Sequence, residues 1–435
     1  MRNLALLSAL ITALALTLRY PFVGTLLWAW IALQNPHQEA YGFLQTAPVN
    51  LVVALTTVVS WLISRERKSL RNDGIFWLIV LFLAWMTFNS FFAVSPSFSW
   101  PFWNDTWKRL ALGLVIALMA NSRLRIYALI WIVVISLFYY GVKGGLFTLV
   151  TGGHFHVFGP PNSMIADNNM LAVALLMTLP LANFLRTQVA SRLIAWIFIG
   201  CSILTIVAIL GTYSRGALIG LAALGVFASF RARNRIAYLG IIGVVAIFVF
   251  NFMPAHFFHR MDSIGVAQQD ASFEGRVHAW KVATMYASTH FPFGAGFNGP
   301  ALGFIYNRYY PGEIPHVAHS IYFEVLGDHG FIGLAIYLAI LASAFLRCAK
   351  TIRATRDRPE LRWAHDLAIA IQSSLFVFCI AGAALSMAYY DLFIIELGLL
   401  LPLYELAVRD RAISKQSWSP SMRVGVGTAM DQLGP

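Results

Sequence analysis

The stretch HSIYFEVLGDHGFIG, from His319 to Gly333, places an ionisable ring at the start of a long apolar segment. Histidine titrates near neutral pH, so His319 can accept a proton from an attacking hydroxyl group. Ser320 follows it, and Tyr322 shares its face of a helix. We therefore take His319 as a candidate general base with Ser320 and Tyr322 as supporting residues, although a lone histidine is more often a capping or interfacial residue.

A second candidate is Arg215 in YSRGALIG, where it opens another apolar segment two residues after Tyr213. An arginine near a membrane is costly and usually pairs or faces a cavity. The N-terminus of a helix offers free N–H groups and a positive dipole end, and a guanidinium fork suits phosphate. The pattern favours an anion site at Arg215 supported by Tyr213, and the alternative is an arginine that extends to lipid headgroups.

A third candidate lies in the long polar interval before His319. Within it, SFEGRVHAWKVATMYAST has helical periodicity and puts Arg276 and Trp280 on one face. Arg276 can supply a second positive charge. An ion pair with Glu274 or Asp270 is the simpler alternative, and such a pair contributes little at a surface.

Smaller candidates surround these three. Lys143 in GVKGG lies near the outer end of a predicted span, where it would add positive charge. Asn168 and Asn169 open a further helix, where capping is a more common role than ligand binding. Asp391 lies in a turn between the last two spans, where it either orients a base or is an ordinary polar turn residue.

Other chemistries find little support in the residue patterns. The histidines form no HExxH motif, and the His154/His156 pair is weak by itself. The chain has no P-loop and no GxGxxG motif. Its three cysteines show no CxxC spacing. The sequence therefore predicts no metal, no cofactor and no nucleotide engine.

The elements that must position these residues are membrane helices. The chain has 435 residues, of which 59% are hydrophobic and 11% charged, against about 25% charged residues in a soluble domain. Apolar runs of about 18–25 residues recur, each long enough to cross a bilayer. The net charge of +12 lies mostly in short loops, which indicates charge that sets topology rather than nucleic-acid binding. We predict an all-α polytopic membrane protein.

We predict about twelve spans. The first contains Arg19 and Pro21 and is either one kinked span or two short helices. The N-terminus imitates a signal peptide, but no small-x-small cleavage site follows it, so we interpret it as a retained span. The predicted spans lie near residues 4–33, 48–64, 74–93, 107–120, 124–148, 167–185, 192–210, 214–230, 236–252, 319–347, 362–387 and 390–408.

Loop charge predicts the orientation. With residues 4–33 counted as one crossing, the clusters of basic residues fall on one side, which the positive-inside rule makes cytoplasmic together with both termini. The predicted divisions are helices one to nine in 1–252, one large outer loop in 253–318, three further spans in 319–412 and a tail in 413–435. Arg215, Arg276 and His319 then face the same outer compartment.

This combination resembles the O-antigen ligase family, which shares a superfamily with the O-antigen polymerases. The likeness rests on YSRGALIG before the loop, GRVHAWKVA inside it and HSIYFEVLGDHGFIG closing it, and it is strongest over residues 160–400. GPPNSMIADNNMLA followed by TLPLANFL also resembles putative O-glycosylation ligases linked to exosortase systems.

The resemblance implies a metal-independent glycosyltransferase of the GT-C-like class in the inner membrane of a Gram-negative bacterium. Such an enzyme takes a glycan from undecaprenyl pyrophosphate at the periplasmic face and transfers it to a sugar hydroxyl of lipid A–core. By motif match, Arg215 and Arg276 would hold the pyrophosphate and His319 would activate the acceptor.

The chemistry of the residue types agrees with these roles. A diphosphate leaving group needs positive charge and N–H donors, and an alcohol acceptor needs a base within hydrogen-bonding reach. Direct displacement predicts inversion at the anomeric carbon. Trp280 and the loop aromatics would line a lateral opening for the lipid carrier.

Three alternatives remain. An O-antigen polymerase would use the same donor with a carrier-linked acceptor, and a protein O-glycosylation ligase would use serine or threonine. A transporter of lipid-linked glycan would perform no chemistry, but it should show repeated halves and charged or broken helices at the bilayer midplane, and the sequence has no such repeat.

Overall fold

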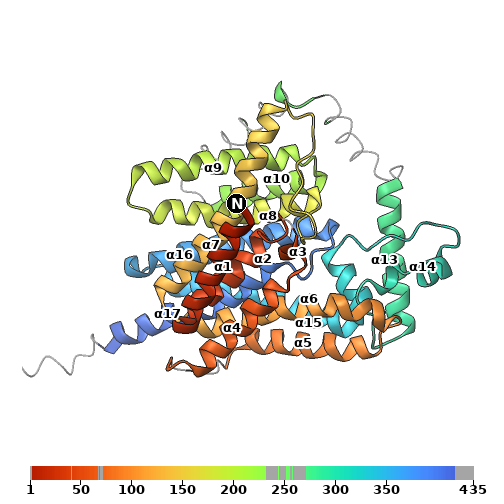
Figure 1. The fold of residues 1–435 in the computed structure, drawn as a ribbon, viewed down its shortest axis with the longest axis horizontal. Helices are drawn as coiled ribbons and strands as arrows, with labels where there is room; N and C mark the ends of the chain where they lie inside the picture. The colour runs from red at the N-terminus through yellow and green to blue at the C-terminus, as the bar shows by residue number, and fades with distance from the viewer. Residues whose placement is uncertain are drawn as a thin grey trace, which may run out of the picture.

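The computed structural model describes residues 2–40, 42–66, 68, 72–231, 243, 251–254, 257 and 271–416. Within these residues the chain is helical, with no strand (Figure 1). The predicted span at 236–252 and the loop up to residue 270 lie almost wholly outside them. The elements are α1 Arg2–Arg19, α2 Pro21–Gln34, α3 Phe43–Thr46, α4 Val49–Ile63, α5 Gly74–Phe91, α6 Pro96–Met119, α7 Arg123–Val150, α8 Asn168–Gln188, α9 Arg192–Gly211, α10 Arg215–Arg231, α13 Ala271–Thr289, η2 Gly299–Ala301, α14 Gly303–Tyr309, α15 Ile321–Thr355, η3 Pro359–Leu361, α16 Arg362–Ala381, η4 Gly382–Ala384 and α17 Asp391–Gln416.

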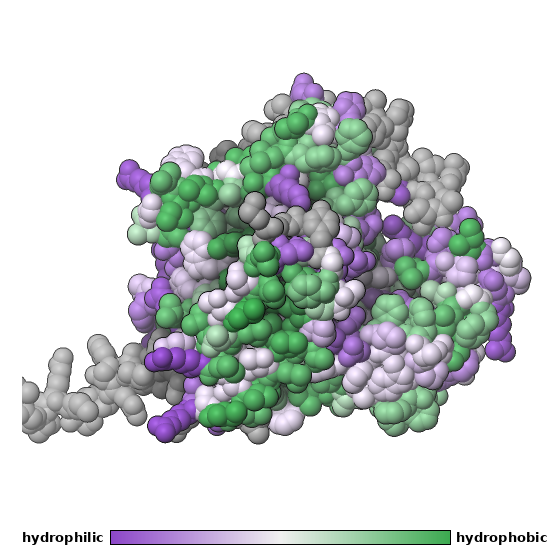
Figure 2. Space-filling view, viewed as in Figure 1, coloured by the Kyte–Doolittle hydropathy of each residue, from purple (hydrophilic) through white to green (hydrophobic). Residues whose placement is uncertain are grey.

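Length and composition support the membrane interpretation. Among the described residues, six helical segments are long and apolar enough to cross a bilayer: α5, α7, α8, α9, α15 and the α16 region Pro359–Ala384. Hydrophobic side chains also cover much of the molecular face over α1, α4 and α9 (Figure 2). The all-helical, multi-pass character is therefore as predicted, whereas the count of about twelve spans stays a prediction.

The N-terminal region forms two short helices rather than one long one. The helix breaks at Tyr20, and Pro21 starts α2, because proline is favoured in the first turn of a helix but cannot donate a bond further along. The Ser60 hydroxyl of α4 donates to Thr17 O near the break at 2.6 Å. This contact ties α4 to the end of α1.

The loops predicted to be cytoplasmic lie together at one end of the bundle. Arg125 at the start of α7 binds Glu66 with two guanidinium nitrogens at 2.9 and 2.6 Å. Arg347 in α15 pairs with Asp73, the N-cap of α5, at 2.5 Å. Helices that start at this end must finish at the other, where α13 and α14 lie in Figure 1, opposite the last turns of α17.

The stretch WPFWNDTWKR, most of which lies between the spans predicted at 74–93 and 107–120, does not form a loop in the structure. It belongs to α6, which starts at Pro96 and so begins before the predicted span at 107–120. Proline at the first position presets the helical φ angle. Trp103 also donates to the Thr87 hydroxyl of α5 at 2.9 Å, so packing on α5 holds this polar stretch in the helix.

The helix that follows His319 is interrupted, which differs from the single continuous span predicted at 319–347. Gly330 has φ 70° and ψ −173° inside α15. The loop before η2 enters at this point, where Gly296 N–H donates to Asp328 O at 3.0 Å and Asn298 N–H donates to Asp328 Oδ1 at 2.8 Å. Gly330 therefore admits a loop, and Asp328 holds that loop in place, whereas Gly327 lies close to Ala283 of α13 and Gly333 close to Trp85 of α5.

Candidate functional site

His319 lies just before α15, which begins at Ile321, and it is half-buried. Its backbone has φ 42°, in the left-handed region that few residues other than glycine adopt. Its N–H donates to the hydroxyl oxygen of Ser386 at 3.0 Å. The predicted base is therefore placed by a contact from the connection between α16 and α17.

Helix α13 packs against the segment that carries His319. The indole N–H of Trp280 donates to Ala318 O at 2.6 Å, and its ring stacks on Phe323 with centroids 5.0 Å apart. Arg276 lies one helical turn before Trp280, on the same face of α13. The helix that carries Arg276 therefore packs on the segment that carries His319.

Charged residues from two other parts of the fold influence the pKa of His319. Burial lowers the pKa of His319, the positive charge of Arg276 lowers it further, and the carboxylate of Asp167 opposes both. His316 makes a smaller lowering contribution. Because the pKa lies below its usual value, the imidazole stays neutral at neutral pH, as a general base requires.

Arg215 is the first residue of α10 and is half-buried. The Ser214 hydroxyl oxygen accepts from Ala217 N–H at 3.3 Å, which caps this helix N-terminus. The Asn168 amide donates to Thr212 O at 2.6 Å, so the start of α8 lies beside the start of α10.

The connection after α16 lies between the starts of α10 and α15. A Cβ atom built on Gly216 would lie 3.9 Å from Ala381 O, and one built on Gly382 would lie 3.0 Å from Ile321 Cγ2. Residues 381–382 therefore contact the helix of Arg215 on one side and the helix after His319 on the other. The N-termini of α8, α10 and α15 meet at this end of the bundle, and helix N-termini favour anions.

Several predicted supporting residues hold the fold through hydrogen bonds to backbone carbonyls. Tyr213 is buried and donates to Gly153 O, and Tyr322 donates to Cys379 O at 3.1 Å.

Asn168 does not cap α8, because its amide donates to Thr212 O; the cap is Asp167. Ser320 is the N-cap residue of α15 but makes no capping bond through its side chain. Trp280, by contrast, contacts both sides of His319 through Ala318 and Phe323.

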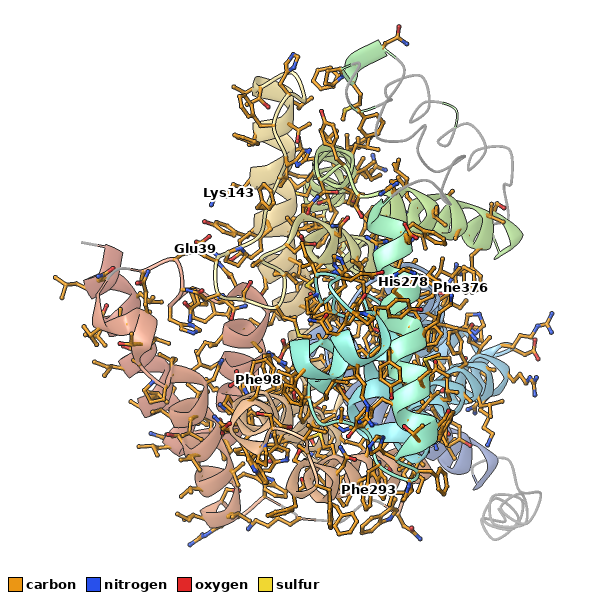
Figure 3. All side chains as sticks on the ribbon, turned by 90° about the vertical axis from the view of Figure 1, so that its right-hand side faces the viewer. Glu39, Phe98, Lys143, His278, Phe293 and Phe376 are labelled. Atoms are coloured by element: carbon orange, nitrogen blue, oxygen red, sulfur yellow. The ribbon has the colours of Figure 1, made fainter. Side chains whose placement is uncertain are left out.

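Lys143 has its contacts elsewhere. Its ammonium lies 3.6 Å from a Glu39 carboxylate oxygen, and Figure 3 shows both residues on one flank of the molecule. Lys143 also borders an open apolar groove of about 750 Å³ between α7 and α9. No contact found for Lys143 connects it with the site around His319.

Asp391 lies near two charged residues, Arg109 and Glu324, that the sequence pattern did not single out. Arg109 of α6 lies 3.6 Å from the Asp391 carboxylate, while Glu324 of α15 accepts from Ala388 N–H at 3.0 Å. Ser386 and Asp167 were also missed as contributors to the site. Asp167 carried one detectable signal, since an Asp just before an apolar run is a typical N-cap.

Metal ligands are not grouped in the described part of the chain. No cluster of three or more His, Cys, Asp or Glu side chains is arranged there to hold an ion. The positive charges predicted to meet a phosphate are instead those of Arg215 and Arg276.

Two family models match parts of this chain. Residues 200–338 match the family model described as O-antigen ligase, and residues 1–190 match a family of unknown function. A comparison with curated proteins finds no match. The ligase match includes Arg215, Arg276 and His319, and it confirms the resemblance predicted from the sequence motifs.

Proposed function

We propose, on the premise that residues 200–338 form an O-antigen ligase domain, that this protein is a glycosyltransferase that uses a polyprenyl-pyrophosphate donor. The observation that carries the proposal is the arrangement at His319. A neutral imidazole lies within the electrostatic reach of Arg276, at an end of the bundle where three helix N-termini meet. Such a site combines a base with a region that attracts anions.

Donor binding is the role of the two arginines. Arg215 and Arg276 would contact the diphosphate, because guanidinium groups bind phosphate oxygens with paired, charge-assisted hydrogen bonds. As the bond from the anomeric carbon to the diphosphate oxygen breaks, negative charge grows on that oxygen. Fixed positive charge stabilises this change more in the transition state than in the bound donor, which accelerates the step.

Acceptor activation is the role of His319. The acceptor hydroxyl attacks the anomeric carbon while its proton passes to the neutral imidazole. The new glycosidic bond forms on the face opposite the leaving group, so the reaction inverts that carbon and releases undecaprenyl pyrophosphate. The carboxylate of Asp167 favours the imidazolium that results, since it raises the pKa of His319.

The proposed acceptor is a sugar hydroxyl of lipid A–core in lipopolysaccharide synthesis, and the ligase description of the matched family supports this choice. The protein would act in the inner membrane of a Gram-negative bacterium, with the site in the periplasm and both termini in the cytoplasm. A carrier-linked glycan or a protein hydroxyl is the alternative acceptor, as in a polymerase or a protein ligase.

Transfer by the purified protein tests this proposal. The full chain in lipid nanodiscs receives undecaprenyl-pyrophosphate glycan with lipid A–core, carrier-linked glycan or peptide, and the product is followed by mass spectrometry. We expect transfer to lipid A–core that persists in EDTA and falls by at least about a hundredfold in His319→Ala. His290→Ala, an exposed histidine at the end of α13, is the matched control and should keep full activity.

Other outcomes would contradict particular parts of the proposal. Transfer to peptide or carrier-linked glycan alone would replace the acceptor. Loss of activity in EDTA would overturn the metal-independent mechanism, and full activity in His319→Ala would remove the base.

Arg215→Ala is a second test. We expect kcat/KM for the donor to fall about ten- to a hundredfold, since the substitution removes charge-assisted bonds to the diphosphate. Arg192→Ala at the exposed start of α9, at the opposite end of the bundle, is the control. Unchanged donor kinetics would show that Arg215 serves lipid headgroups instead.

A further inference from the structure

We infer that Ser386 is a positioning residue for the base: its hydroxyl oxygen fixes the backbone of His319 and so sets the direction of the imidazole. The inference rests on the proposed function, because it assigns Ser386 a part in that reaction. It comes from the hydrogen bond between His319 N–H and Ser386 Oγ, whose length is 3.0 Å.

His319 needs such a contact because the helix does not hold it. The following residue, Ser320, is the N-cap of α15 and has an extended backbone with φ −161°. His319 itself has φ 42°, a conformation that a residue with a Cβ atom rarely adopts without outside support. A change in this φ angle would swing the Cβ atom and the ring away from Arg276.

The turn that carries Ser386 is itself fixed on α15. Ala388 N–H donates to Glu324 Oε2 at 3.0 Å, and the Tyr337 hydroxyl donates to Ala388 O at 3.2 Å. The Tyr389 hydroxyl donates to Asp328 Oδ2 at 3.3 Å. Three side chains of α15 therefore fix the turn. The Ser386 hydroxyl, which belongs to this turn, in turn fixes the backbone of His319.

The same connection also adjoins the helix that begins with Arg215. Ala381 O lies beside Gly216, while Ser386 lies five residues further along the chain, beside His319. The short segment 381–386 thus adjoins both His319 and the start of α10, which carries Arg215. Because reacting groups must be held closely in place, a loose His319 would slow transfer without weakening the donor site.

The test compares three substitutions in the full chain in nanodiscs. Ser386→Ala removes the acceptor of the His319 N–H, Ser386→Cys keeps the size with a weaker acceptor, and Ser386→Thr keeps the hydroxyl. Ser373→Ala is the matched control, since that hydroxyl bonds Ile369 O within its own helix α16. We expect kcat to fall about tenfold in Ser386→Ala and less in Ser386→Cys, with recovery in Ser386→Thr, while KM for the donor stays unchanged.

A second readout does not depend on transfer. Diethylpyrocarbonate modifies accessible neutral histidines, and mass spectrometry gives the rate at His319. We expect the modification rate of His319 to change in Ser386→Ala and to return to that of the unaltered protein in Ser386→Thr. In Ser373→Ala the rate should equal that of the unaltered protein. If the unaltered protein transfers no glycan, the proposed function fails, and this rate alone decides whether Ser386 positions His319.

Two results would overturn the inference. One is an unchanged kcat together with an unchanged modification rate in Ser386→Ala. The other is a parallel loss of kcat, donor affinity and thermal stability that Ser386→Thr does not restore, because that pattern indicates a general structural role.

Discussion

The pKa of His319 is influenced by charges of opposite sign from two other parts of the fold, helix α13 and the start of α8. Arg276 of α13 lowers its pKa and Asp167 at the start of α8 raises it, while burial lowers it most. The two charged residues are far from each other in the chain, so each can be removed without touching the other. Their opposite signs make a pair of substitutions with opposite expected effects.

The pH dependence of transfer should reveal both charges. A base acts when it is neutral, so activity falls as the pH drops through its pKa. Arg276→Gln removes a charge that lowers the pKa of His319 and should move this acid limb to higher pH. Asp167→Asn removes a charge that raises the pKa and should move the limb to lower pH.

The measurement is kcat against pH at saturating donor, together with the titration of labelled histidine by NMR. His290→Ala serves again as the control and should leave the limb in place. A shift in the same direction for both variants would contradict the arrangement around His319.

At the scale of elements, the break in α15 is the feature that admits the loop following α13. Gly330 interrupts the helix, and the backbone of Gly294 to Asn298 approaches it closely enough to bond with Asp328. The Asn89 amide of α5 donates to Asp328 O at 2.7 Å and accepts from Gly294 N–H at 2.9 Å. This docked loop follows α13 in the chain and so helps to hold Arg276 near His319.

Gly330→Ala should therefore destabilise the protein. A Cβ atom there would collide with the backbone of Pro292 and Phe293, and φ 70° disfavours any side chain. We expect a loss of at least about 2 kcal/mol, seen as a lower thermal midpoint in detergent. In the control Gly200→Ala, the new methyl group points into open space on α9, so the midpoint should hold or rise. An unchanged midpoint in Gly330→Ala would mean that the helix closes over the break.

At the scale of the whole molecule, the described helices have two chemically distinct ends. One end carries the pairs Arg125–Glu66 and Arg347–Asp73, and the other carries His319, Trp280 and the N-termini that favour anions. The positive-inside rule predicts that the first end is cytoplasmic. The proposed donor is reached from the other side.

Single cysteines can test this orientation. In a background where Cys201, Cys348 and Cys379 are replaced, Ser288→Cys at the end of α13 should react with a membrane-impermeant maleimide in cells with a permeabilised outer membrane. Glu360→Cys, exposed in η3, should react only after lysis. Reaction of both before lysis, or the reverse order, would contradict the predicted topology.

The sequence by itself determined the class of the protein and the main candidates for chemistry. Low charge with repeated apolar runs dictates membrane helices, because a bilayer leaves the backbone no partner outside the segment. The motifs YSRGALIG and HSIYFEVLGDHGFIG identified Arg215 and His319 as candidate site residues. Both the type of a residue and its position at the start of an apolar segment can be read from the sequence.

Only the tertiary structure decided which residues lie close to one another. Asp167 and Ser386 lie far from His319 in the chain, and no periodicity links them to it. The sequence predicted supporting roles for Tyr213 and Lys143, yet the Tyr213 hydroxyl bonds the Gly153 carbonyl in a neighbouring loop and Lys143 pairs with Glu39. Hydropathy predicts which residues are buried. Which of these residues contact one another depends on the packing of the helices and on the loop that enters at Gly330.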